Sequence, residues 1–246
     1  SRAKQIWEKP VAILVNRYSA SASEIVAGAI QDYKRGIVIG QRTFGKGTVQ
    51  SLESISKGQI KITESKYYRV DGSSTQNKGV IPDIELLSTW DIESVGESSY
   101  PTAMEWDTVR PYRHKKFKFD DNQIEEINNL YSQRLNEDPN LKYLAKVRER
   151  YNQNKDKKLL SLNINTRKSE KEARRTWQLE IENNRRKVLE LTTFESFEEL
   201  EEHNKNENKE NDEKIDLNKD FLLIESTNIV NDYINMNKKI LLSERD

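Results

Sequence analysis

A strand–helix–strand pattern near the N-terminus constrains the fold of this chain most. The apolar run Val11–Val15 is typical of a strand buried on both faces. From Ser21 to Tyr33, apolar residues recur at three- and four-residue steps, which predicts an amphipathic helix. Two cations and a glycine end that helix, and a second apolar strand follows at residues 37–39. Together these elements predict a parallel βαβ unit with a right-handed crossover.

Two residues of this unit could carry chemistry. Ser21 follows the first strand at the helix N-terminus, and Lys46 lies in the glycine-rich loop TFGKG after the second strand. Both therefore emerge at the sheet edge where ligands gather. A serine hydroxyl needs a base to become a good nucleophile, and a lysine amine can be that base when burial favours its neutral form. The N–H groups of the helix N-terminus favour a developing oxyanion.

The same residues have plainer interpretations. Ser21 and Glu24 fit the S-x-x-E capping box, in which they would only begin the helix. Lys46 could be a solvated loop lysine. The two histidines, His114 and His203, lie in charged stretches far downstream and offer no obvious competing base. From the residues alone, the catalytic and the structural interpretations both stay open.

The motifs YSASASEI, QDY and TFGKGTVQ resemble those of the C-terminal processing peptidases, serine-protease family S41, and most of all its tail-specific proteases. The resemblance implies an α/β (α+β) peptidase core. It also implies a role for five residues: Ser21 as nucleophile, Lys46 as general base, Asp32 in the catalytic set, Gln50 orienting Lys46, and the backbone N–H of Ala22 as an oxyanion donor.

Asp32 and Gln50 each have a structural interpretation beside the catalytic one. At about 1.5 Å rise per residue, a straight helix places Asp32 almost a helix length from Ser21, so direct contact is not expected. Asp32 could equally be a carboxylate that holds the fold. Gln50 could simply be a strand residue that faces the Lys46 loop.

The rest of the chain divides by pattern. Residues 59–63 alternate polar and apolar side chains, as a half-buried strand does, and KYYRVDGSSTQNKGVIPDIEL completes the sheet without an assigned catalytic role. Later apolar stripes predict four helices, spanning roughly residues 120–135, 139–151, 169–191 and 221–240. Residues 161–165 are strand-like, and residues 201–220 are polar enough to be flexible.

We therefore predict three regions. Residues 1–90 form the C-terminal part of an S41 catalytic domain, residues 91–106 a linker, and residues 107–246 a helical domain. With 34% hydrophobic and 33% charged residues, one compact core through the whole chain is not expected. In the resembled family, a PDZ domain and a glycine that donates to the oxyanion precede these regions. We expect the chain to be a C-terminal fragment that is inactive alone.

Composition narrows the range of functions that the chain can have. Net charge is zero, from 41 basic and 41 acidic side chains, so no global field favours nucleic acid or an anionic membrane. The absence of cysteine excludes thiol chemistry and disulfides. The resemblance implies a Ser/Lys endopeptidase that processes proteins from apolar C-terminal tails, without metal or nucleotide. It implies the periplasm, at the inner-membrane face, and an adaptor lipoprotein as a further partner. The alternative is a helical scaffold protein built on an inactive protease platform.

Overall fold

The computed structural model describes residues 6–87, 94–117, 121–213 and 217–243. The chain forms two compact units, one made of residues up to 129 and from 226 onward, the other of residues 130–225. Each is described by itself below. These units divide the chain at positions other than the predicted functional boundaries near residues 90 and 107, which stay predictions.

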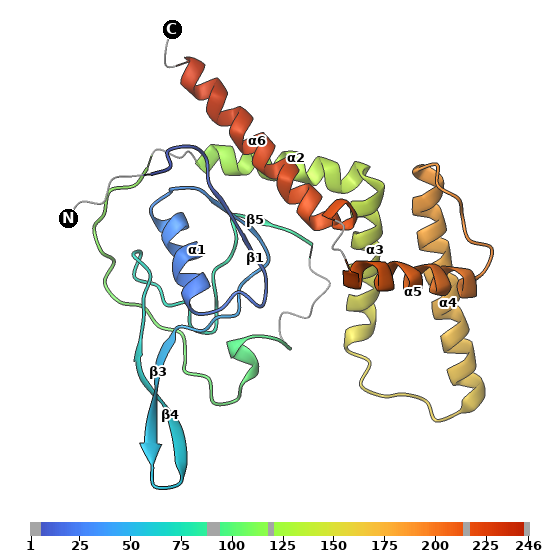
Figure 1. Cartoon of the computed structure of the whole chain (residues 1–246), viewed down its shortest axis with the longest axis horizontal. Coiled ribbons are helices and arrows are strands. Elements are labelled where there is room, and N and C mark those ends of the chain that lie inside the picture. The colour runs from blue at the N-terminus through green and yellow to red at the C-terminus, as the bar shows by residue number, and fades with distance from the viewer. Residues whose placement is uncertain (1–5, 88–93, 118–120, 214–216, 244–246) are drawn as a thin grey trace. The chain divides into compact units, whose positions relative to one another are not determined.

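A small parallel sheet lies at the centre of the first unit. Its strands are β1 (Ala12–Val15), β2 (Ile37–Gly40) and β5 (Ile84–Glu85), in the order β1-β2-β5. The helix α1 (Ala22–Asp32) connects β1 to β2, which pair in parallel from Ala12–Ile37 to Val15–Gly40. The predicted βαβ unit is therefore confirmed, and Figure 1 shows α1 lying beside this sheet.

The sheet is buried mainly through its middle strand. All four residues of β2 are buried, whereas Leu14 in the edge strand β1 is 50% exposed. The prediction that the first strand is buried on both faces was therefore wrong at Leu14, because no strand among the described residues covers the outer edge of β1. A core cluster joins the sheet to α1 and to the chain before β5; its members are Val15, Ala27, Val38 and Val80, with Ile13 and Ile30 against them.

The buried side of α1 matches its apolar stripe only in part, through Ile30, which packs against the core cluster. Ile25 and Val26 are each about half exposed, whereas Glu24, Gly28 and Asp32 are buried. Gly28 makes room for a side chain, because a Cβ there would lie 3.1 Å from Nε of Arg69. The buried carboxylates of Glu24 and Asp32 thus help to hold the helix in this unit. The hydrophobic period did not predict that these residues would be buried.

A two-stranded ribbon extends from the sheet and α1, as Figure 1 shows. It consists of β3 (Thr48–Ile55) and β4 (Gly58–Lys66), which pair antiparallel with a register irregularity between Val49 and Gln50. The predicted strand at residues 59–63 is confirmed as part of β4. Gly58 has φ 106°, which suits the tight turn between the strands.

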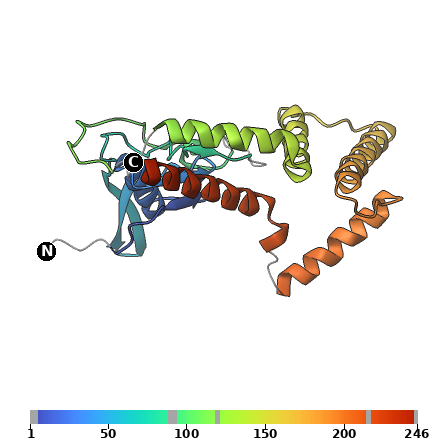
Figure 2. The same ribbon diagram turned by 90° about the horizontal axis from the view of Figure 1, so that it is seen from above.

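The remaining elements are helical. They are α2 (Asp121–Glu137), α3 (Pro139–Lys155), α4 (Ile164–Val188), α5 (Phe197–Glu213) and α6 (Phe221–Ser243), with 3-10 turns η1 (Glu97–Ser99) and η2 (Leu217–Lys219). The four predicted helices are confirmed as α2, α3, α4 and α6. Figure 2 shows α2 and α6 side by side, and an ion pair joins Arg134 of α2 to Glu225 of α6 at 2.8 Å.

Two predictions in this region were wrong. Residues 161–165 form no strand, because the side chain of Asn163 accepts hydrogen bonds from the N–H groups of Asn165 and Thr166 and so begins α4. Residues 201–213 are helical in α5 rather than flexible. Ion pairs at i,i+4 spacing, such as Lys205–Glu201, help to stabilise this helix. Residues 214–216 lie outside the described part. Within the described residues, no helix combines the length and hydropathy that a membrane crossing requires.

Candidate active site

Ser21 has a strained backbone. It follows β1, stands at the N-terminus of α1, and has φ 56° and ψ −114°. An ordinary N-cap serine has an extended backbone, so a capping role alone does not explain this conformation. Non-glycine residues with positive φ persist only where their surroundings hold them, and they gather at functional sites. A serine on such a turn between strand and helix can present its hydroxyl outward.

The Glu24 side chain joins Ser21 to the lysine loop. One carboxylate oxygen accepts hydrogen bonds from the backbone N–H groups of Ser21 at 2.9 Å and of Lys46 at 2.8 Å. The other oxygen accepts from the Thr43 hydroxyl at 2.5 Å and from the Gly45 N–H at 2.7 Å. Burial raises the pKa of Glu24, and these donors oppose that rise. One buried carboxylate therefore fixes both residues that the sequence pairs.

The glycines beside Lys46 are required by close packing. Gly45 has φ 94°, and a Cβ there would lie 2.8 Å from the carbonyl oxygen of Asn77. A Cβ at Gly47 would lie 2.7 Å from the backbone nitrogen of Gln76. The buried Gln76 side chain also accepts a hydrogen bond from the Gly47 N–H at 2.9 Å. Residues 74–77 (S-T-Q-N), which come later in the chain, thus pack closely against the loop that carries Lys46.

A buried arginine holds the other side of this loop. Arg17 is 1% exposed and donates hydrogen bonds to the carbonyl oxygens of Thr43 and Val95. The N–H of Glu97 donates to the carbonyl of Phe44 at 2.9 Å. Residues 95–97, within the predicted linker, therefore pack against the loop that carries Lys46.

Glu24→Ala should damage both stability and activity in the complete protein. It leaves the N–H groups of Ser21, Gly45 and Lys46 without their acceptor, and each unsatisfied buried group costs about 1–3 kcal/mol. We expect the free energy of unfolding to fall by about 3 kcal/mol or more, measured by urea denaturation. Glu24→Gln keeps one acceptor oxygen and should lose less. The exposed Glu53→Ala is the control, and wild-type stability and rate in Glu24→Ala would contradict this role.

Asp32 is held at the far end of α1. Its carboxylate accepts hydrogen bonds from the Arg69 guanidinium at 2.5 and 3.2 Å and from the Val70 N–H at 3.1 Å. Its side chain is 5% exposed and that of Arg69 15% exposed. Within the described residues, no hydrogen bond brings Asp32 to Ser21 or Lys46. This geometry favours the fold-holding interpretation of Asp32.

Asp32→Ala should therefore act on stability first. Removing one partner of a buried ion pair costs about 3–5 kcal/mol, and Arg69→Ala should cost a similar amount. The double variant should cost less than the sum of the two. Asp121→Ala is the matched control, because its ion pair with Lys34 is exposed and should be worth about 1 kcal/mol or less. If Asp32→Ala keeps wild-type stability and abolishes cleavage, Asp32 acts in the chemistry instead.

The other predicted site residues have separate positions. Gln50 donates from its side-chain amide to the Thr63 hydroxyl of β4 at 3.1 Å, so the structure does not bring it to Lys46, and its orienting role stays a prediction. No hydrogen bond from the N–H of Ala22 is seen among the described residues, and its role as an oxyanion donor stays a prediction.

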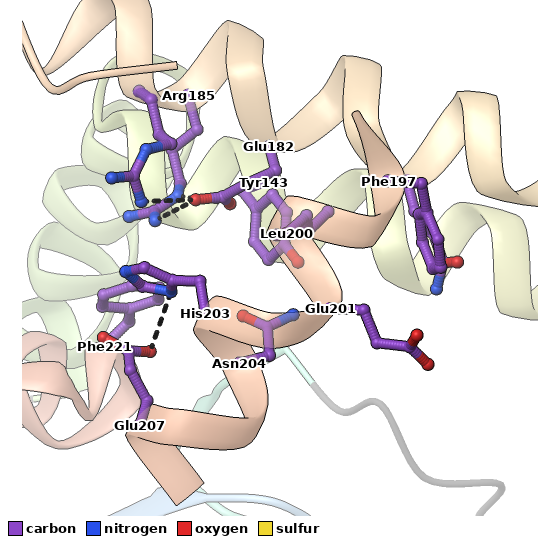
Figure 3. Close-up of a pocket in the computed structure, with 12 residues that line it drawn as sticks. Tyr143, Glu182, Arg185, Phe197, Leu200, Glu201, His203, Asn204, Glu207 and Phe221 are labelled. Carbon is purple, nitrogen blue, oxygen red and sulfur yellow. Dashed lines mark hydrogen bonds and ion pairs between the residues drawn. The ribbon is translucent and has the colours of Figure 1, made fainter. Parts of the chain in front are cut away.

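Both histidines have contacts of their own. His114 has its ring nitrogens 2.9 Å from the carbonyl oxygens of Tyr112 and Asp32, and these hydrogen bonds raise the pKa of His114. His203 belongs to the second unit, where its ring packs against Phe194. It lines a pocket of about 280 Å³ beside an Arg185–Glu182 ion pair, as Figure 3 shows.

The sequence motifs predicted Ser21 and Lys46 as site residues, but they did not reveal some of the residues that hold these two in place. Glu24 entered only as a helix-capping residue, although the capping box was the signal that could have found it. Arg17, Thr43 and Gln76 are buried polar residues within or beside the quoted motifs, and nothing in a single sequence marks them as buried.

Comparison with known proteins identifies the family. Residues 1–86 match the family described as "Peptidase family S41", and residues 90–235 match "C-terminal domain of tail specific protease". The tail-specific protease of Haemophilus influenzae is 39% identical over 180 residues, covering 68% of this chain and 26% of that protein. The carboxy-terminal-processing protease of Bartonella bacilliformis is 49% identical over 78 residues, covering 31% of this chain and 18% of that protein.

A solved structure gives a further similarity. The photosystem II D1 C-terminal processing protease is 45% identical, with a TM-score of 0.30, over 31% of this chain and 20% of that one. The chain thus spans about a quarter or less of the length of these relatives. Because the match to the C-terminal domain covers more than half of the chain and the S41 match covers most of the remainder, the chain belongs to the tail-specific protease family, within peptidase family S41.

Proposed function

We propose that this chain supplies the Ser21–Lys46 dyad of a serine endopeptidase that processes or degrades proteins from their C-terminal tails. One observation carries the proposal: a single buried carboxylate, Glu24, accepts hydrogen bonds from the backbone N–H groups of both residues. A helix cap at Ser21 requires only the hydrogen bond between Glu24 and the Ser21 N–H. It does not require the second bond from the same oxygen to the Lys46 N–H. The family membership gives independent support.

The chemistry follows from the two side chains. Lys46, with a neutral amine, takes the proton of the Ser21 hydroxyl while Oγ forms a bond to the scissile carbonyl carbon. The carbonyl oxygen gains the negative charge, which the Ala22 N–H and the N-terminal end of α1 stabilise. The C–N bond then breaks as the Lys46 ammonium returns the proton to the leaving amine. Water hydrolyses the acyl-enzyme with Lys46 again taking and returning a proton.

Substrates, partners and location belong to the same proposal. The substrates are proteins with apolar C-terminal tails, and an adaptor lipoprotein is a partner. The periplasm is the proposed location, because the relative from Haemophilus influenzae, a Gram-negative bacterium, carries the name tail-specific protease. Asp32 supports the reaction by holding α1 through Arg69.

An activity-based serine probe on the complete protein tests the proposal. A fluorophosphonate should label the wild-type protein at Ser21 and should leave Ser21→Ala unlabelled. A reporter protein with an apolar tail should be cleaved, and the same reporter with a charged tail should be cleaved far more slowly. A folded protein that neither reacts with the probe nor cleaves the reporter would favour the scaffold alternative.

A further inference from the structure

The hydroxyl of Tyr67 lies between the two residues of the proposed dyad. It donates a hydrogen bond to the carbonyl oxygen of Lys46 and lies 3.2 Å from the carbonyl oxygen of Ser21. The backbone sets this position, because the N–H of Tyr67 donates to the carbonyl of Gly47 at 3.0 Å, directly after the end of β4. The backbone of Tyr67 is therefore fixed at the base of the ribbon, and its hydroxyl reaches the loop that carries Lys46.

This contact completes a reciprocal arrangement. Glu24 accepts from the N–H groups of Ser21 and Lys46, and Tyr67 faces the carbonyl oxygens of the same two residues. The carboxylate thus binds the N–H groups of both residues, whereas the single O–H of Tyr67 is donated to the Lys46 carbonyl beside the carbonyl of Ser21. The positive φ of Ser21 is a strained backbone conformation for a non-glycine residue, and it persists only where such surroundings hold it.

The phenol is a constant donor. Burial raises the pKa of Tyr67 to about 12. A hydrogen bond with the Thr75 side chain opposes that rise, and the carboxylates of Glu24 and Glu97 add to it. Tyr67 therefore keeps its proton at every pH at which a protease would be assayed. It does not compete with Lys46 as a base, and its contribution is the geometry that its O–H imposes.

We propose that Tyr67 is a positioning residue for the Ser21–Lys46 dyad. Its hydroxyl holds the carbonyl of Lys46 beside the carbonyl of Ser21 and so sets the separation of the two backbones. This inference rests on the proposed function, because it needs Ser21 and Lys46 to react together. A displacement of about 1 Å between reacting groups can cost roughly 100-fold in rate, so one hydrogen bond at this place can control kcat.

Tyr67→Phe in the complete protein tests the inference, because it keeps the ring and removes only the O–H. We expect kcat for a peptide with an apolar C-terminal tail to fall by about 10- to 100-fold, with KM within about twofold. The rate of inactivation by a fluorophosphonate should fall in parallel. The matched control is Tyr68→Phe, because the neighbouring hydroxyl lies 3.1 Å from Asp107 and should leave both rates unchanged.

A second replacement separates positioning from packing. 4-Aminophenylalanine at position 67 keeps the ring and restores an N–H donor, so it should recover most of the lost kcat. If the phenylalanine variant does not fold, kcat of the 4-aminophenylalanine variant is compared with that of the wild type instead. Wild-type kcat and probe reactivity in Tyr67→Phe would overturn the inference. So would a rise in KM alone, or a folded 4-aminophenylalanine variant as slow as the phenylalanine one.

Two reference variants keep this inference apart from the proposed function. If Ser21→Ala or Lys46→Ala still cleaves the peptide at the wild-type rate, the proposed dyad is wrong and the positioning role falls with it. If both are inactive and Tyr67→Phe is at the wild-type rate, the dyad stands and only the positioning role is wrong.

Discussion

Ser21→Ala in the complete protein should lower kcat/KM for a peptide with an apolar C-terminal tail by roughly 10⁴-fold or more, since loss of a nucleophile removes the covalent route. The protein should still fold. Loss of a helix-cap interaction costs only about 0.5–2 kcal/mol, and the Glu24 hydrogen bonds to backbone N–H groups do not need the serine hydroxyl. Kinetics and thermal unfolding, measured together, separate these two effects.

Ser23→Ala is the matched control for that experiment. Ser23 is exposed in the first turn of α1, two residues from the proposed nucleophile, and its loss should change neither rate nor stability appreciably. Cleavage at the wild-type rate by purified Ser21→Ala would show that another group attacks the carbonyl.

Lys46→Arg should be as inactive as Lys46→Ala, again by roughly 10⁴-fold in kcat/KM. A general base must be neutral to take the serine proton, and arginine is effectively always protonated. The arginine variant keeps the positive charge and the backbone N–H that binds Glu24, so it isolates the loss of proton transfer. The measurement is kcat/KM for both variants against the wild type.

Two controls complete the lysine experiment. Lys57→Arg, at the exposed turn between β3 and β4, should be silent. A His114→Ala/His203→Ala double variant should keep its activity, because the proposed base is Lys46. His114 binds the carbonyl oxygens of Tyr112 and Asp32, and His203 packs against Phe194. Substantial activity in Lys46→Arg would leave the lysine only an electrostatic role. A folded but inactive double variant would instead indicate a Ser–His mechanism.

The part of the site that was predictable from the sequence depends on topology. Parallel strands place their carboxyl ends at one edge, so a βαβ pattern was enough to expect Ser21 and Lys46 beyond neighbouring strands. The glycines around Lys46 likewise predicted a tight loop, and the close approach of Asn77 to Gly45 gives the reason. Local pattern and global fold agree at these positions.

The rest could not be predicted because it depends on contacts between distant segments. The hydrophobic period of α1 includes Ile25 and Val26, which are about half exposed, and it does not mark Glu24 and Asp32, which are buried. Hydropathy treats a carboxylate as exposed and does not know that N–H donors from another loop will surround it. Tyr67 was only a β-prone residue in sequence, since its partners lie 46 and 21 residues away along the chain.

The ribbon of β3 and β4 has a mechanical consequence for the site. Its first strand starts at Thr48, two residues after Lys46, and its second strand ends at Lys66, immediately before Tyr67. The ladder pairs Thr48 with Lys66, so the segments that lead to Lys46 and to Tyr67 are joined at the base of the ribbon. A displacement at the base of the ribbon would therefore reach Lys46 and Tyr67 together.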